Sequence, residues 1–125
     1  MTILVDSDIL IEVSRGRNAS IVSRWMELSK SEALILFSPV SASELRAGAR
    51  PAEHEGLEAL FEALVCVPTD SAIGLRAGDY LRRYRKSHGI ELGDALVAAS
   101  AVARNATLWT RNHRHYPMKD LAFFD

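Results

Sequence analysis

Short apolar runs alternate with longer segments of helical periodicity along the chain. The runs have the length and residue types of buried β-strands, and they lie at 3–5, 34–37, 64–67, 107–110 and 122–124. The segments between them have apolar residues every three or four positions, as amphipathic helices do, at 21–26, 57–64, 73–84 and 96–103. Gly89 follows the third of these helices as an expected C-cap. This alternation predicts an α/β domain with a parallel sheet.

Composition agrees with one ordinary globular domain. The chain has 125 residues, of which 48% are hydrophobic and 25% charged, and it has no repeat or linker, so we expect one domain over residues 1–125. The single cysteine, Cys66, excludes an internal disulfide, and its apolar neighbours predict a small buried residue. The sequence shows neither a signal peptide nor an apolar stretch of membrane-spanning length, which predicts a cytoplasmic protein.

Charge alone gives no reason to expect a nucleic-acid partner, because the net charge is −1. Basic residues nevertheless gather at 81–88 and again at 110–115. Solvated helix faces are the simpler interpretation of such clusters. RNA binding is the alternative interpretation.

Polar side chains follow several of the predicted strands directly. Asp6 and Asp8 come after the first strand, Glu44 lies in the first helical turn after the second, and Asn112 follows the fourth. Because the carboxyl ends of parallel strands meet at one edge of the sheet, we expect these side chains to lie close together. Clustered carboxylates repel one another, which implies a cation between them. Oxygen ligands without a cysteine or histidine pair favour Mg²⁺ or Mn²⁺ over zinc.

Each of these residues also has a purely structural interpretation. Ser41 and Glu44 match the S-x-x-E capping box, and from spacing alone capping is the favoured role for Glu44. Asp8 has the right position to cap a helix that starts at Ile9, and Asp94 to favour the positive end of its helix dipole. Asn112 is also an ordinary turn residue.

Four motifs taken together resemble a known family. VDSDILIE (5–12), SASELRAGA (41–49), GIELGDALVAASA (89–101) and TLWTRNHRHYP (107–117) are similar, in order and spacing, to the motifs of PIN-domain ribonucleases, most closely VapC-type toxins. The resemblance covers residues 3 to about 117. It implies a three-layer α/β/α sandwich with a parallel sheet of about five strands. It also implies a metal-dependent endoribonuclease, the toxin of a VapBC-type toxin–antitoxin system.

The resemblance assigns roles to residues by motif position. It implies that Asp6, Glu44 and Asp94 hold Mg²⁺ or Mn²⁺, and that Asn112 occupies a fourth catalytic position, where the family often has an acid or an asparagine. Asp8 stands where the family commonly has asparagine, so its role stays open. Without the motif match, strand order does not bring Asp94 to the site, because two helices precede the fourth strand.

Neighbouring residues complete the expected site. Metal-activated water would hydrolyse the RNA phosphodiester. Asp8, Ser7 and Thr110 are expected to support the metal ligands, and the RNA-binding candidates are Arg46, Arg111, His113 and Arg114. The expected partners are RNA, a VapB-type antitoxin that covers the acidic site, and a second copy of the chain in a homodimer. The apolar face of 55–65 and the tyrosines of 79–88 are candidates for that dimer contact.

Three alternatives belong to other classes. A haloacid-dehalogenase-type phosphatase also has a strand followed by D-x-D, but it expects threonine or valine where this chain has Leu10. A response-regulator receiver domain needs an aspartate at the end of a central strand, where this chain has Ser38 and Pro39. A PIN domain that binds RNA or protein without cleavage is the third alternative.

Overall fold

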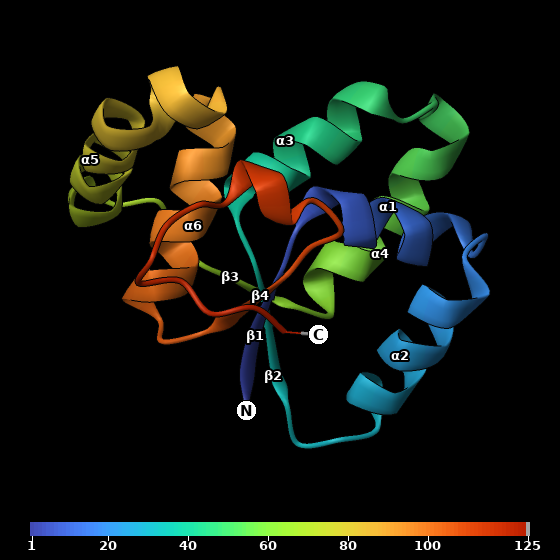
Figure 1. Cartoon of the computed structure of the whole chain (residues 1–125). Helices are drawn as coiled ribbons and strands as arrows, with labels where there is room; N and C mark the ends of the chain where they lie inside the picture. The colour runs from blue at the N-terminus through green and yellow to red at the C-terminus, as the bar shows by residue number, and fades with distance from the viewer. Residues whose placement is uncertain (125) are drawn as a thin grey trace.

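Four parallel strands form the centre of the computed structural model, which describes residues 1–124. They are β1 (Thr2–Val5), β2 (Leu34–Phe37), β3 (Val65–Cys66) and β4 (Thr107–Trp109). Their order across the sheet is β3-β2-β1-β4, with β1 and β2 in the middle (Figure 1). The register pairs Leu4 with both Leu36 and Leu108, so three leucines form a row across the sheet.

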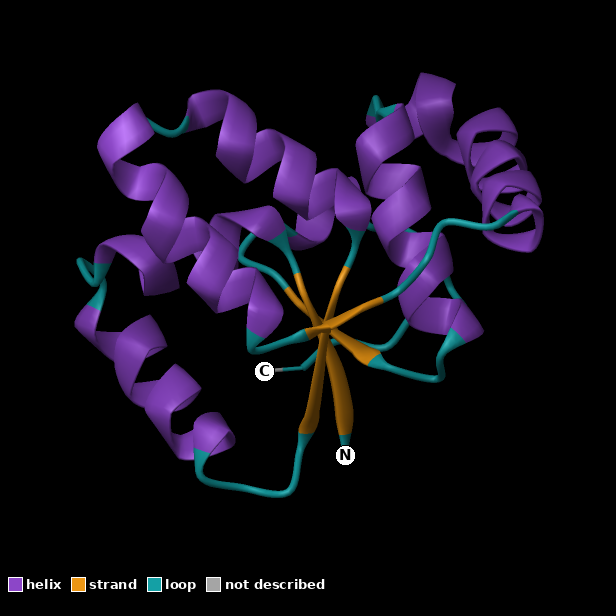
Figure 2. Ribbon diagram, turned by 180° about the vertical axis from the view of Figure 1, so that it is seen from behind, coloured by secondary structure: helices purple, strands orange, loops and turns teal. Residues whose placement is uncertain are grey.

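Helices cover both faces of this sheet (Figures 1 and 2). The α-helices described are α1 (Ser7–Arg15), α2 (Ala19–Ser29), α3 (Pro39–Gly48), α4 (His54–Glu62), α5 (Ser71–His88) and α6 (Leu92–Ala103). Two single-turn 3₁₀ helices are η1 (Pro51–Glu53) and η2 (His113–His115). The helices α5 and α6 lie on one side, with α1, α2 and α4 on the other (Figure 1). The predicted α/β/α sandwich is therefore confirmed.

Alternating side chains of the strands build two separate cores. Leu4, Leu36 and Leu108 are almost fully buried against α5 and α6, while Ile3 and Val5 point into the second core beneath α1 and α4. Successive residues of a strand point to opposite faces, so a strand buried on both sides needs a continuous apolar run. This explains why the strand segments read as uninterrupted apolar runs in the sequence.

The sheet has four strands rather than about five. Residues 122–124 do lie beside β4, where Leu108 N–H donates to Ala122 and Phe124 N–H donates to Leu108. The pairing is a single parallel bridge between Leu108 and Phe123, too short to count as a strand. The predicted fifth strand is therefore reduced to one bridge at the sheet edge.

Cys66 is exposed, which contradicts the prediction that it is buried. It belongs to β3, a two-residue strand at the edge of the sheet, and Val65 beside it is also exposed. Burial begins one residue later, at Val67, which is fully buried. An apolar run does not reveal whether its strand lies at the centre or the edge of a sheet, because strand order is set by tertiary packing.

The antiparallel pair of α5 and α6 brings Asp94 to the carboxyl edge of the sheet. Gly89 ends α5 in the left-handed conformation (φ 61°), as predicted, and its N–H donates to Arg85. A left-handed backbone favours glycine, and it reverses the chain within three residues. The first turn of α6 therefore lies beside the last turn of α5. A β-carbon added at Gly93 in that turn would lie only 3.3 Å from the Val40 side chain at the start of α3.

Tyr80 gives the fold a testable response to alkaline pH. Its hydroxyl donates to Asp120, and burial with that contact raises its pKa to about 12. The unfolded phenol ionises near its ordinary pKa of 10.0, while the folded phenol stays protonated, so this contribution to stability is lost as pH rises from about 10 to about 12.

We expect the free energy of unfolding of Tyr80→Phe to fall less steeply over that range than that of the unaltered protein. Chemical denaturation at several pH values measures the slope. Tyr84→Phe is the matched control, because the Tyr84 hydroxyl bonds to no residue in the described part of the chain. Equal slopes for Tyr80→Phe and the unaltered protein would show that the Tyr80 contact has no such effect.

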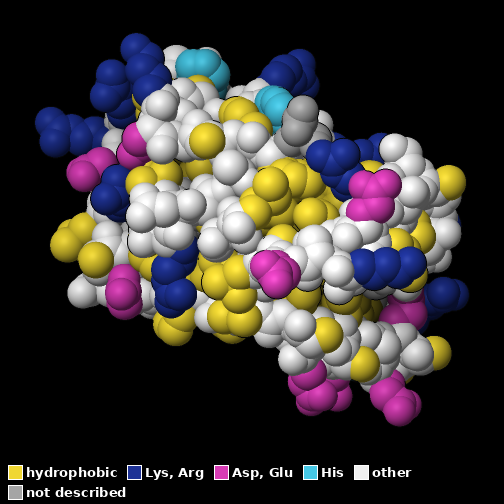
Figure 3. Space-filling model, turned by 90° about the horizontal axis from the view of Figure 1, so that it is seen from below, with side chains coloured by type: hydrophobic (Ala, Val, Ile, Leu, Met, Phe, Trp, Pro, Cys, Tyr) yellow, Lys and Arg dark blue, Asp and Glu magenta, His cyan; other side chains and the backbone are white. Residues whose placement is uncertain are grey.

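The opposite end of the molecule, where β1 begins, carries exposed apolar side chains (Figure 3). Met1, Leu28, Ala33 and Phe124 line a shallow hollow there.

Within residues 1–124, no helix combines the length and the apolar content needed to cross a membrane.

Candidate active site

A pocket opens at the carboxyl edge of the sheet, between the first turns of α1 and α6 and the chain after β4. Its lining contains five carboxylates, one amide and one phenol, contributed by segments far apart in the sequence. The lining residues are Asp6, Ser7, Asp8, Glu44, Glu91, Gly93, Asp94, Val97, Asn112, His115 and Tyr116. The structure thus brings together all four predicted catalytic residues.

Asp6 is buried at the base of this pocket and is held by three hydrogen bonds. It is the N-cap of α1, and its Oδ1 accepts from Ser7 N–H at 2.8 Å. Its Oδ2 accepts from Tyr116 Oη at 2.8 Å and from Thr110 Oγ1 at 2.9 Å. Burial and the charge of Asp6 raise the pKa of Tyr116, so the phenol stays protonated and donates. Asp6, rather than Asp8, therefore caps the first helix.

Glu44 does not form the predicted capping box. The cap of α3 is Ser38, whose hydroxyl accepts from Val40 N–H, and Pro39 occupies the first helical position. Ser41 and Glu44 consequently lie inside the helix, where the backbone N–H groups of a capping box are already bonded. Ser7 Oγ instead donates to Glu44 Oε1 at 2.6 Å, which holds this carboxylate at the pocket.

His115 lies close to both Asp94 and Asn112 at the pocket. Asp94 Oδ2 accepts from Glu91 N–H at 3.1 Å, so Asp94 does stabilise the start of α6, as the structural interpretation predicted. Its pKa is raised, first by burial and further by the charge of Asp6. His115 Nδ1 lies 3.0 Å from Asn112 Nδ2 and 3.8 Å from Asp94. The capping role leaves the other oxygen of Asp94 for the pocket.

Asp8 connects α1 to the chain after β4. Its Oδ2 accepts from Arg111 N–H at 2.9 Å and from Thr110 Oγ1 at 3.4 Å. Its Oδ1 is buried, and no residue of the described chain donates to it. Burial and the nearby charge of Asp6 raise the pKa of Asp8. A buried carboxylate oxygen without a donor is costly, which indicates that a cation or a donor from outside the chain completes it.

The donor chemistry of this pocket fits a hard divalent cation. Carboxylate and amide oxygens dominate the lining. Burial, and to a smaller extent the charge of Asp6, raise the pKa of both Asp8 and Asp94, so a cation at the pocket would favour their charged forms. In residues 1–124, however, no three His, Cys, Asp or Glu side chains converge closely enough to hold a metal ion as they stand. The residues supply the right ligand atoms, and binding requires their side chains to close on the ion.

The predicted RNA-binding residues lie outside the pocket lining. Arg46 pairs with Glu58 at 3.1 Å, and Arg111 pairs with Glu12 at 3.3 Å. The ring of His113 stacks on Phe123, with 4.1 Å between the ring centroids. None of these three side chains is part of the pocket lining, and neither is the exposed Arg114.

Sequence reasoning missed the role of Tyr116 and the positions of Glu91 and Gly93. Tyr116 contacts Asp6, from which it is separated by 110 residues in the sequence. No local sequence pattern predicts a contact between residues so far apart. Glu91 lines the pocket because it is the N-cap of α6 and Gly93 because it lies in the first turn. The sequence signal that could have identified Glu91 is its position three residues before Asp94, at the start of the same helix.

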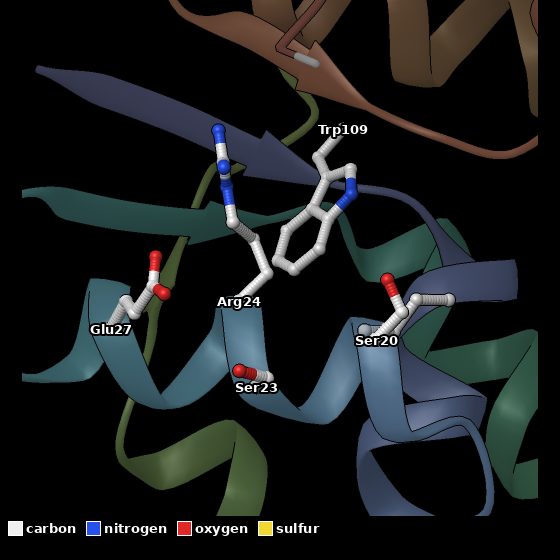
Figure 4. A pocket seen from close by; sticks show the side chains of 6 residues that line it. Ser20, Ser23, Arg24, Glu27 and Trp109 are labelled. Carbon is white, nitrogen blue, oxygen red and sulfur yellow. The ribbon is translucent and has the colours of Figure 1, made fainter.

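A second hollow lies between α2 and the end of β4 (Figure 4). Ser20, Ser23, Arg24 and Glu27 come from α2, with Trp109 opposite them. Trp109 also stacks on Trp25, with 6.5 Å between ring centroids. A single carboxylate lines this hollow, so it offers no counterpart of the acidic pocket.

Comparison with solved structures agrees with this architecture. VapBC2 from Rickettsia felis, bound to a DNA fragment from its promoter, matches with a TM-score of 0.82 and 22% identity over 99% of this chain and 98% of the other. VapBC-1 from nontypeable Haemophilus influenzae matches with a TM-score of 0.80 and 24% identity, over 100% and 98% of the two chains. Identities at this level show a shared fold.

Sequence comparison identifies the family. Ribonuclease VapC10 of Mycobacterium tuberculosis is 41% identical over 93% of this chain and 86% of its own length. Ribonuclease VapC19 of the same organism is 40% identical over 92% of each chain. The PIN domain family model matches residues 3–122. The chain belongs to the PIN domain family.

Proposed function

We propose that this protein is a metal-dependent endoribonuclease, the toxin of a VapBC-type toxin–antitoxin system, and that residues 1–125 form one PIN domain. The observation that carries the proposal is the pocket in which Asp6, Glu44, Asp94 and Asn112 meet, each in its family motif. Relatives with 40 and 41% identity are named ribonucleases. We place its action in the cytoplasm, where RNA and an antitoxin are available to it.

We propose that Asp6, Glu44 and Asp94 hold Mg²⁺ or Mn²⁺. Such an ion lowers the pKa of bound water and stabilises the charge that develops on the scissile phosphate. Tyr116, Thr110 and the Ser7 N–H fix Asp6 in one orientation, and the Ser7 hydroxyl fixes Glu44. Ligands that are already oriented lose less entropy when they close on an ion.

Asp8 has a supporting role in this proposal. Its bond to Arg111 N–H fixes the turn that carries Asn112, and thereby holds the amide at the pocket. The asparagine that the family commonly has at this position would offer an uncharged oxygen to accept the same hydrogen bond from Arg111 N–H. The extra negative charge of Asp8 increases the demand for a cation.

A VapB-type antitoxin is the proposed protein partner, because the structural neighbours are toxin–antitoxin complexes. An antitoxin with a basic side chain would complement the five carboxylates of the pocket. Homodimer formation stays a prediction from the family resemblance. The apolar residues suggested for that contact pack in the protein's own cores: Leu57, Leu60, Phe61, Tyr80 and Tyr84.

The alternative functions have less support. Leu10, where the phosphatase family expects threonine or valine, is fully buried in α1. That family also expects a later lysine, and the pocket lining described has none. A non-cleaving binding module has no use for the carboxylates that this chain keeps at the pocket. RNA hydrolysis accounts for both the acids and the amide.

Incubation of total RNA with the purified, antitoxin-free protein tests the proposal. We expect discrete products with Mg²⁺ or Mn²⁺ and none with EDTA, because the pocket acids alone cannot activate water. Mapping the ends of the products identifies the RNA that is cut. Absence of cleavage by folded protein with both metals would instead support the binding module.

A further inference from the structure

The last two turns of α5 carry four cations that the acidic pocket does not use. These residues, Arg82, Arg83, Arg85 and Lys86, are all exposed, and we name them the α5 basic face. In the part of the chain that the structure describes, none of them forms an ion pair, and only Arg83 has a partner, the ring of Tyr84 at 5.6 Å. The arginines elsewhere are often paired, as Arg76 is with Asp120 at 3.1 Å.

The like charges of the α5 basic face repel one another in the isolated chain. Arg82 and Lys86 are four residues apart, and Arg82 and Arg85 are three apart, so like charges lie next to one another on the helix surface. Placement at the C-terminal end offsets part of this repulsion through the helix dipole. The remaining repulsion is relieved when a polyanion binds.

The α5 basic face lies beside the acidic pocket. Gly89 ends α5, and Glu91, which lines the pocket, follows two residues later. Three residues of extended chain, from His88 to Glu91, span at most about 11 Å. A strand bound to these turns of α5 is therefore close enough to reach the pocket.

A substrate with phosphates needs such a surface. The five carboxylates of the pocket repel phosphate until a cation is bound, and Arg46 and Arg111 are engaged by Glu58 and Glu12. We propose that the α5 basic face is the docking surface for the RNA backbone and delivers the strand to the pocket. This inference rests on the proposed ribonuclease function, and it adds the residues that hold the substrate outside the site.

The test measures RNA binding in EDTA, so that cleavage does not enter the result. The probe is fluorescently labelled single-stranded RNA of mixed sequence, and the readout is anisotropy over a series of salt concentrations. The test variant is Arg82→Gln/Arg85→Gln. The control is Lys30→Gln/Arg104→Gln, which removes the same charge from exposed residues at the C-terminal ends of α2 and α6.

We expect the test variant to bind about tenfold more weakly at about 0.15 M salt, since each phosphate contact contributes a slope of about 0.7 in log K against log salt for single strands. The slope should fall by about 1.4, while the control stays within about twofold of the unaltered protein. Circular dichroism checks that each variant is folded.

Three results would overturn the proposal: no RNA binding by the unaltered protein, equal losses in the two variants, or equal affinity for polyglutamate and RNA of the same charge. The last result would assign the face to an acidic protein segment. Retained binding with no cleavage in Mg²⁺ or Mn²⁺ would leave the docking surface in place and contradict only the ribonuclease function.

Discussion

On the proposed function, Asp6→Asn should reduce RNA cleavage at least about a hundredfold, because a carboxylate proposed to hold the metal is lost, and with it several kcal/mol of transition-state stabilisation. Asp6 is the carboxylate that the protein orients most completely, with donors from Ser7, Thr110 and Tyr116. The asparagine side chain has nearly the same shape as aspartate but no charge. Its NH₂ group cannot accept the hydrogen bonds that the Thr110 and Tyr116 hydroxyls donate to Asp6. Product formation from total RNA with Mn²⁺ measures the effect.

Glu62→Gln is the control for this experiment. Glu62 is exposed on α4, and the substitution also changes a carboxylate to an amide, away from both the pocket and the α5 basic face. We expect its activity to stay within about twofold of the unaltered protein, as for surface substitutions that leave packing intact. Comparable activity of Asp6→Asn and Glu62→Gln would remove Asp6 from the proposed site.

Leu108→Ala should destabilise the protein by about 3 kcal/mol, within the range of about 2 to 5 kcal/mol for buried leucines. Leu108 is fully buried in the middle of β4, opposite Leu4, and packs against the α5 and α6 core. Truncation removes apolar contacts and leaves a cavity that a β-sheet closes poorly. Thermal unfolding should show a midpoint lower by about ten degrees or more.

Leu75→Ala makes the same truncation where little packing is lost. Leu75 is 74% exposed on α5, so we expect a change within about 0.5 kcal/mol. If the two variants unfolded at the same temperature, Leu108 would not have the packing role that its burial indicates.

Much of the fold followed from local patterns in the sequence. Buried runs at β1, β2 and β4 and the helical stripes of α2, α4, α5 and α6 were predicted because burial on one or both faces leaves a direct periodic mark. Gly89 was also predicted, since a left-handed helix end favours glycine. The exposure of Cys66 and the reduction of residues 122–124 to a bridge depend on strand order and pairing length, which periodicity does not record.

The candidate site was predicted in part for the same reason. Strand ends indicated Asp6, Asp8 and Asn112, but spacing alone favoured a capping box for Glu44. Ser38 and Pro39 start α3 three residues earlier than that capping box requires, and this frees Glu44 for the pocket. Only the motif resemblance placed Asp94 there, since its position depends on how α5 packs antiparallel to α6.

The bonds that orient Asp6 also set the order in which the site becomes complete during synthesis. Two of its three donors, Thr110 and Tyr116, lie 104 and 110 residues after it in the chain. A ribosome adds about 5 to 20 residues per second, and the exit tunnel holds the newest segment, so a nascent chain presents Asp6 without these donors. Its acidic pocket is therefore assembled only after Tyr116 has been synthesised. A chain cut short before Tyr116 would keep most of its helices and lack a formed site.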